Sequence, residues 1–198
     1  MVATASRASS AEHAVVRIVS SSTWGLLGAP LGGHSLTVTR IAFSPDDSLV
    51  LTVSRDRGWR LFSRTEQGYV PHAAEERAHA RMVLDCAWAS SDTFVTASRD
   101  KSVKVWTSSQ GKWEAKATIK LDEAATAVAV HEDLVAVGTE SGAVTIYSLS
   151  AGEPHVVAAV PSAERHATAI TRLAWRPHGR VLASAGEDRA VRVFEVCV

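Results

Sequence analysis

The chain has 198 residues, of which 46% are hydrophobic and 21% are charged, and its 21 basic residues balance its 21 acidic residues. This balance excludes a general electrostatic attraction to nucleic acid or to an anionic membrane, so any such affinity must come from local clustering. Two cysteines are too few for a disulfide framework and no apolar run approaches the length of a transmembrane helix, which together predict a cytoplasmic and nuclear protein.

In chain order, residues 1–12 lack an apolar stretch, so we expect a disordered N-terminal segment and no signal peptide. Residues 13–32 predict half of a β-sheet, because Val15–Val19 has the pattern of a single strand. Residues 33–75, 76–121 and 122–161 each predict one four-stranded sheet, the third being degenerate. Residues 162–198 predict a sheet that lacks its last strand.

Internal repetition supports these boundaries. The windows 54–62, 98–106 and 186–194 align without gaps, and residues 139–147 form a weaker fourth copy. Equivalent positions at 56, 100, 141 and 188 are separated by 44, 41 and 47 residues. This period is typical of the blades of a WD-repeat β-propeller, and apolar residues alternate with polar ones as in strands. The sequence therefore predicts an all-β fold, an open arc of about four antiparallel blades forming a partial propeller.

A histidine precedes each repeated aspartate by a nearly constant interval of 22, 21 and 22 residues. In proteins with similar repeats, the aspartate accepts a hydrogen bond from the histidine, the histidine reaches a serine or threonine, and that hydroxyl reaches a tryptophan. The resemblance implies this complete network for His79, Ser98, Asp100 and Trp106. It implies partial networks for His34, Ser54 and Asp56, and for His166 and Asp188, where Gly186 and Phe194 occupy the other two positions.

These histidines and aspartates could instead indicate acid–base catalysis or a metal site. Repetition favours the structural interpretation, because a catalytic constellation occurs once and these pairs recur at the spacing of the sheets. The sequence also lacks a phosphate-binding loop, a nucleophile elbow and metal-ligand spacing. We therefore expect no enzyme activity, no catalytic residue, no metal, no cofactor and no small-molecule substrate.

Basic residues gather in the turns between the second and third strands and in the loops that precede the first strands. The predicted partner-binding set is Arg55, Arg57, Arg81, Arg99 and Lys101. Because these turns and loops share one face of a propeller, the set predicts a positive patch suited to carboxylates or phosphates. Two interpretations stay open: ordinary solvated loop charges, or contact with a protein or an RNA.

Residues 12–110 resemble the Elongator complex protein 2 family of WD-repeat proteins, on residues 12–18, 33–46, 53–57, 79–81, 85–88 and 98–101. Residues 124–196 resemble WD-repeat proteins more generally. The resemblance implies a non-catalytic scaffold that holds the largest subunit and the catalytic subunit of the Elongator complex, which modifies wobble uridines in transfer RNA. Since family members are longer, it also implies a C-terminal fragment. The alternatives are a module that contacts RNA directly through the arginines and an adaptor of another complex.

Overall fold

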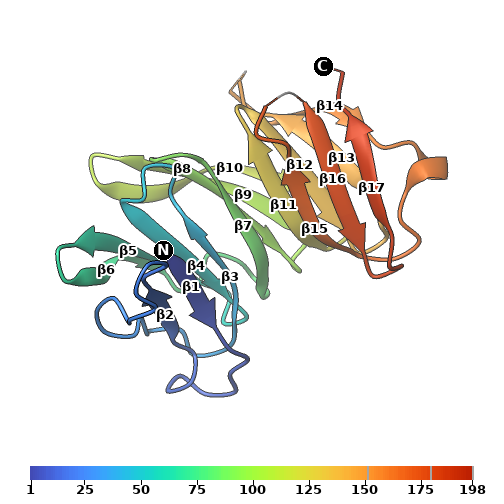
Figure 1. Cartoon of the computed structure of the whole chain (residues 1–198). Helices are drawn as coiled ribbons and strands as arrows, with labels where there is room; N and C mark the ends of the chain where they lie inside the picture. The colour runs from blue at the N-terminus through green and yellow to red at the C-terminus, as the bar shows by residue number, and fades with distance from the viewer. Residues whose placement is uncertain (151, 179, 198) are drawn as a thin grey trace. The chain divides into compact units, whose positions relative to one another are not determined.

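The computed structural model describes residues 1–150, 152–178 and 180–197. Within these ranges the regular structure consists of antiparallel β-strands and one short 3-10 turn, Ser162–Glu164 (Figure 1). The chain divides into two compact units, Met1–Leu84 and Asp85–Val198, which are described separately. No helix in the described ranges has the length and apolarity needed to cross a bilayer.

The first unit holds a two-stranded sheet and a four-stranded sheet. The two-stranded sheet pairs β1 (Val2–Ala5) with β2 (Val16–Val19), and Val2 lies opposite Val19. The four-stranded sheet has the order β3 (Val38–Phe43), β4 (Leu49–Ser54), β5 (Trp59–Thr65), β6 (Gly68–Glu75).

The expectation of disorder over residues 1–12 is wrong for Val2–Ala5. Their backbone N–H and C=O groups form hydrogen bonds with β2. In a disordered segment the same groups would bond to water. Ala3 also packs against a core that includes Val16 and Ile18, both at most 2% exposed. Val2 and Thr4 favour a strand, but the four-residue sequence VATA is too short to give a strong signal, so the pairing partner decides the structure here.

Strand β7 (Val83–Ser90) begins at the end of the first unit and runs into the second. It forms a sheet with β8 (Thr93–Ser98), β9 (Ser102–Ser109) and β10 (Lys112–Lys120). The next sheet comprises β11 (Ala125–His131), β12 (Leu134–Thr139), β13 (Val144–Ser148) and β14 (His155–Ala159). The last comprises β15 (Ile170–Trp175), β16 (Val181–Gly186) and β17 (Val191–Glu195). In every one of these sheets, consecutive strands are neighbours.

The second strand of each four-stranded sheet is covered on both faces. Five of the six residues of β4 and of β8 are buried, and all six of β12 are. Such strands read as continuous apolar runs in the sequence, as Leu134–Val137 does. In the second unit, side chains of adjacent sheets form two continuous cores, one of which joins Val144 and Ile146 to Ile170 and Leu182. The predicted all-β, WD-repeat β-propeller class is confirmed.

A threonine bulge recurs at the start of three first strands. Register shifts enclose Thr39, Thr126 and Thr171. Each hydroxyl donates a hydrogen bond to a carbonyl oxygen of the second strand, at 3.1, 3.2 and 3.1 Å respectively. A bulge bends its strand and re-aims the side chain that follows. The residues that follow are Arg40, Ala127 and Arg172, and the last of these matters for the site below.

Candidate functional site: histidine–aspartate pairs and basic turns

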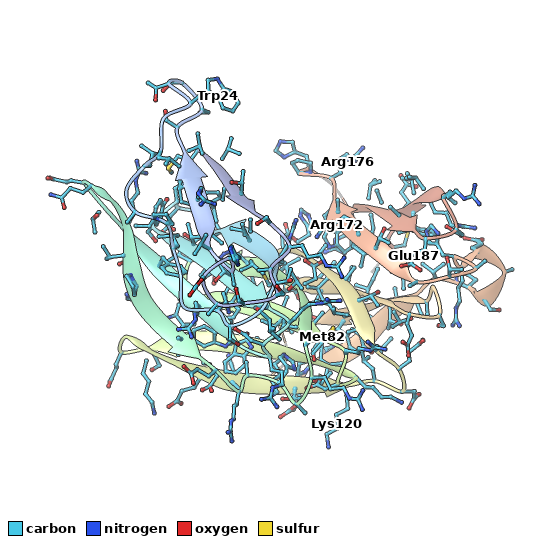
Figure 2. All side chains as sticks on the ribbon, turned by 90° about the horizontal axis from the view of Figure 1, so that it is seen from below. Trp24, Met82, Lys120, Arg172, Arg176 and Glu187 are labelled. Carbon is cyan, nitrogen blue, oxygen red and sulfur yellow. The ribbon has the colours of Figure 1, made fainter. Side chains whose placement is uncertain are left out.

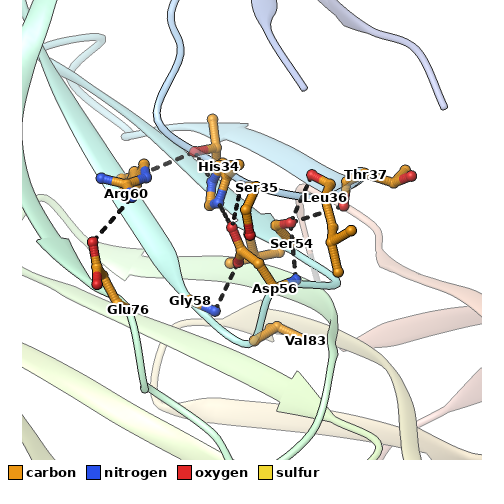
Figure 3. A network of polar contacts seen from close by, with 12 residues as sticks. His34, Ser35, Leu36, Thr37, Ser54, Asp56, Gly58, Arg60, Glu76 and Val83 are labelled. Carbon is orange, nitrogen blue, oxygen red and sulfur yellow. Dashed lines mark hydrogen bonds and ion pairs between the residues drawn. The ribbon is translucent and has the colours of Figure 1, made fainter. Parts of the chain in front are cut away.

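The first pair lies under the turn between β4 and β5 (Figure 3). His34 Nδ1 is 2.9 Å from Asp56 Oδ2, and His34 Nε2 is 2.8 Å from Thr52 Oγ1. Asp56 also accepts hydrogen bonds from the backbone N–H groups of Ser35, at 2.9 Å, and Gly58, at 3.0 Å. Since an ionised carboxylate only accepts, His34 donates to Asp56 through Nδ1, while Nε2 forms a hydrogen bond with the Thr52 hydroxyl. The carboxylate thus links the loop before β3 to the turn between β4 and β5, next to a buried imidazole.

The last sheet repeats this geometry. His166 Nδ1 is 2.8 Å from Asp188 Oδ1, and His166 Nε2 is 2.8 Å from Ser184 Oγ. Asp188 accepts from the N–H of Ala167 at 3.1 Å, and the Arg192 guanidinium lies 3.1 Å from Asp188 Oδ2. Both histidines are at most 3% exposed. A buried pair held in the same way in two sheets is a structural element, because each polar group is satisfied internally.

The prediction of Ser54 as the network hydroxyl is wrong. His34 contacts Thr52, while Ser54 donates to the carbonyl oxygens of Leu36, at 3.0 Å, and Thr37, at 2.9 Å. Residues two apart on a strand share a face, so the sequence pattern alone does not choose between positions 52 and 54. The same two-residue offset applies to the last repeat, where the hydroxyl was expected at position 186 and His166 contacts Ser184 instead.

In the second repeat the tryptophan does donate to a hydroxyl, but the acceptor is Thr96, two residues before the predicted Ser98. Trp106 Nε1 donates to Thr96 Oγ1 at 2.9 Å, and Ser98 Oγ accepts from the backbone N–H of Asp100 at 3.0 Å. Ser98 therefore shapes the turn and does not receive the indole. His79 belongs to the first unit and Asp100 to the second, so their pairing stays a prediction.

In the third repeat, where no member of the network was expected, a carboxylate takes the place of the histidine. Glu123 precedes β11 and accepts from Thr139 Oγ1 at 2.8 Å, from Ser141 Oγ at 2.6 Å and from the backbone N–H of Ser141 at 2.9 Å. The loop now supplies the acceptor and the turn supplies the donors, the reverse of the other repeats. The only sequence signal was an acidic residue ahead of a strand, which is too common to be diagnostic.

These contacts set the ionisation of the two paired aspartates. Burial raises the pKa of Asp56, but the hydrogen bonds from His34, Gly58 and Ser35 outweigh it and lower the pKa to about 2. For Asp188, the hydrogen bond from His166 is the main cause of a pKa well below the usual range. Both groups are therefore carboxylates at neutral pH, as the geometry requires.

The lowered values predict acid-sensitive stability. A carboxyl whose folded pKa lies below its unfolded value of 3.8 binds fewer protons in the folded state. Its contribution is fully present above the unfolded pKa and is lost as the pH falls towards the folded pKa. For Asp56 the loss between those two values is about 2 kcal/mol. Urea unfolding of the purified chain over this pH range measures it, and Asp56→Asn should flatten that part of the profile.

The predicted basic residues are exposed in both units: Arg55, Arg57 and Arg81 in the first, Arg99 and Lys101 in the second. Lys101 Nζ donates to the carbonyl oxygen of Asp122 at 2.8 Å, so part of its donor capacity is used within the chain. The turns place Arg57, Lys101 and Arg189 at φ values of 80°, 67° and 63°, the conformation in which the third repeat has Gly142. The turns thus present long basic side chains from a fixed backbone position.

A buried carboxylate that sequence reasoning missed lies in the second unit. Asp85 is 2% exposed and accepts from the backbone N–H groups of Cys86, at 3.0 Å, and Val128, at 3.1 Å. Arg172, labelled in Figure 2, lies 3.2 Å from it and follows the bulge in β15. Asp85 therefore joins the first strands of three sheets. An isolated aspartate in an apolar run was the available signal.

Metal-ligating side chains do not cluster in the described part of the chain. Within it, no group of three or more histidine, cysteine, aspartate or glutamate side chains could hold a metal ion. The polar residues that repeat are those of the buried networks, one set per sheet. Exposed surface lies on the turns and loops and also on strands such as β10 and β17.

The sheets, the period and the networks together define a WD-repeat β-propeller protein. The family model described as "WD domain, G-beta repeat" matches residues 25–63 and 73–107, and the "Anaphase-promoting complex subunit 4 WD40 domain" matches residues 126–197.

The resemblance to Elongator complex protein 2 is confirmed over almost the whole chain. The protein of that name from Saccharomyces cerevisiae is 33% identical over 214 residues, covering 99% of this chain and 27% of the relative. The one from Arabidopsis thaliana is 37% identical over 225 residues, covering 98% of this chain and 27% of the relative. The one from Danio rerio is 32% identical over 248 residues, covering 99% of this chain and 30% of the relative. The chain thus spans less than a third of the length of these relatives.

Proposed function

We propose that this chain is a non-catalytic scaffold module of an Elongator complex, acting in the modification of wobble uridines in transfer RNA. The observation that carries the proposal is similarity to proteins named Elongator complex protein 2 over 98–99% of the chain, in organisms as distant as a yeast, a plant and a fish. The buried networks support the non-catalytic part, because two of the three repeated histidine–aspartate pairs already have structural partners.

Affinity purification tests this proposal most simply. The protein carrying this chain is tagged at its native locus and the co-purifying proteins are identified by mass spectrometry. We expect the largest subunit and the catalytic subunit of the complex, and a tagged line in which the protein is depleted should lose modified wobble uridines. Purification without either subunit would contradict the proposal. We further propose that the complex is found in the cytoplasm and the nucleus, which imaging of the same tag would examine.

The exposed arginines favour a second candidate, direct contact with RNA. Arg55 and Arg57 flank the paired Asp56, whose charge is engaged by His34, so the turn presents two guanidinium groups outward. Arginine binds phosphate through paired hydrogen bonds, and several such contacts make affinity fall steeply with salt.

Charge reversal separates the two candidates. The triple variant Arg55→Glu, Arg57→Glu, Arg99→Glu should weaken transfer RNA binding by about tenfold or more and reduce the salt slope if the arginines contact phosphates. If they contact a protein subunit, the variant should lose that subunit on purification and keep its salt slope. If both assembly and RNA binding survive, the arginines are ordinary solvated charges.

A further inference from the structure

A groove of about 630 Å³ lies in the first unit, beside the loop that precedes β3. It is lined by the N-terminal residues 7–9, the loop residues 36–37, Arg55 of the β4–β5 turn and Met82 of the loop before β7. Met82 is labelled in Figure 2, and Leu36 and Thr37 are seen beside Ser54 in Figure 3. A volume of this size is in the range of ligand-binding clefts.

The walls of the groove are fixed to one another through Thr37. Its hydroxyl accepts from the N–H of Ala8 at 3.0 Å and donates to the carbonyl oxygen of Ala8 at 2.7 Å. Its own carbonyl oxygen accepts from the N–H of Arg55 at 3.0 Å and from the hydroxyl of Ser54 at 2.9 Å. The N-terminal segment, the loop and the turn therefore keep one arrangement, and a partner need not order them on binding.

The lining combines apolar side chains with positive charge. Leu36 is 39% exposed, and Met82 supplies a second, flexible apolar side chain. Arg7 and Arg55 are exposed at the same groove, and no carboxylate is found among the described residues that line it. The neighbouring carboxylate, Asp56, is held by His34.

We propose that this groove binds a peptide segment of a partner protein in which an apolar side chain is flanked by carboxylates. The apolar side chain would cover Leu36 and Met82, and the carboxylates would pair with Arg7 and Arg55. RNA fits less well, because its bases bind to aromatic platforms and no aromatic residue is among those that line the groove. The inference rests on the proposed scaffold function and adds where a partner binds and by what chemistry.

The test is selection of a random-peptide library, displayed on phage, against the purified chain. Parallel selections use the double variant Arg7→Glu, Arg55→Glu and the single variant Leu36→Asp. The matched control is Arg17→Glu, which reverses an exposed arginine of β2 in the same unit. Circular dichroism of each protein verifies that it is folded, and polyuridylate RNA is added as a competitor.

The proposal expects enriched peptides that place acidic residues on both sides of an apolar residue. A synthetic peptide of the enriched sequence should bind the wild type and the control equally, and the double variant about tenfold more weakly or worse. No enrichment, enrichment without acidic residues, or binding that survives both groove variants would overturn it. Displacement by polyuridylate would show an anion site in place of a peptide groove. These readouts do not require Elongator subunits, so their failure is distinct from failure of the affinity purification.

Discussion

Replacing Asp85 with asparagine should destabilise the chain by about 3 kcal/mol, one of the two largest effects expected of a single substitution. Its carboxylate is 2% exposed and accepts hydrogen bonds from the N–H groups of Cys86 and Val128, which lie on two different strands. An asparagine of the same shape presents one acceptor and one donor, so at least one buried N–H loses its partner and the Arg172 guanidinium loses a negative charge.

Arg172→Met is the informative comparison for this substitution. The Arg172 side chain is 47% exposed, so water replaces its interactions and Asp85 keeps both backbone donors. We expect a loss of about 1 kcal/mol or less, measured by urea unfolding alongside Asp85→Asn. Equal losses for the two variants would mean that the ion pair, and not the buried carboxylate with its backbone donors, holds the strands together.

Gly142→Ala should cost about 3 kcal/mol or more of the free energy of unfolding. Gly142 has φ +86° in the turn between β12 and β13, and an added Cβ would collide with the carbonyl oxygen of His166 and lie 2.7 Å from that of Thr168. This backbone has little freedom to move, because His166 is held by both Asp188 and Ser184. The clash must therefore be relieved by separating the two sheets.

Gly152→Ala provides a matched control for the backbone conformation. Gly152 has φ +88°, nearly the same value, but no atom lies within 4 Å of its added Cβ. Only the left-handed conformation is then penalised, by about 1 kcal/mol. Thermal or urea unfolding of both variants separates the two causes. If Gly142→Ala is no worse than Gly152→Ala, the close approach of the turn to His166 does not constrain the fold.

The repeat period and the strand patterns were sufficient to predict the four larger sheets, and the constant histidine–aspartate interval predicted two pairs now seen at 2.9 and 2.8 Å. The hydroxyl partner was misplaced by two residues because a strand presents positions 52 and 54 on the same face. Which of them meets His34 depends on how deeply the imidazole is inserted, and that is fixed by tertiary packing.

Other features depended on partners distant in sequence. Glu123 substitutes for a histidine because it meets the donors of Ser141, 18 residues away. Asp85 accepts from the N–H of Val128, 43 residues away, and from Arg172, 87 residues away, after a bulge re-aims that arginine. The N-terminal strand Val2–Ala5 forms because β2 offers it an edge. None of these contacts leaves a periodic trace, so single-sequence reasoning has no pattern from which to infer them.

The most direct measurement of whether the repeated pairs are internal structural elements is a double-mutant cycle on His34 and Asp56. Urea unfolding of the wild type, His34→Ala, Asp56→Ala and the double variant gives the coupling energy between the two side chains. Because the pair is buried and 2.9 Å apart, we expect a coupling of about 1 kcal/mol or more. If the two single-variant losses add to within about 0.3 kcal/mol, the imidazole and the carboxylate do not stabilise the fold together. That result would contradict a structural role for the pair.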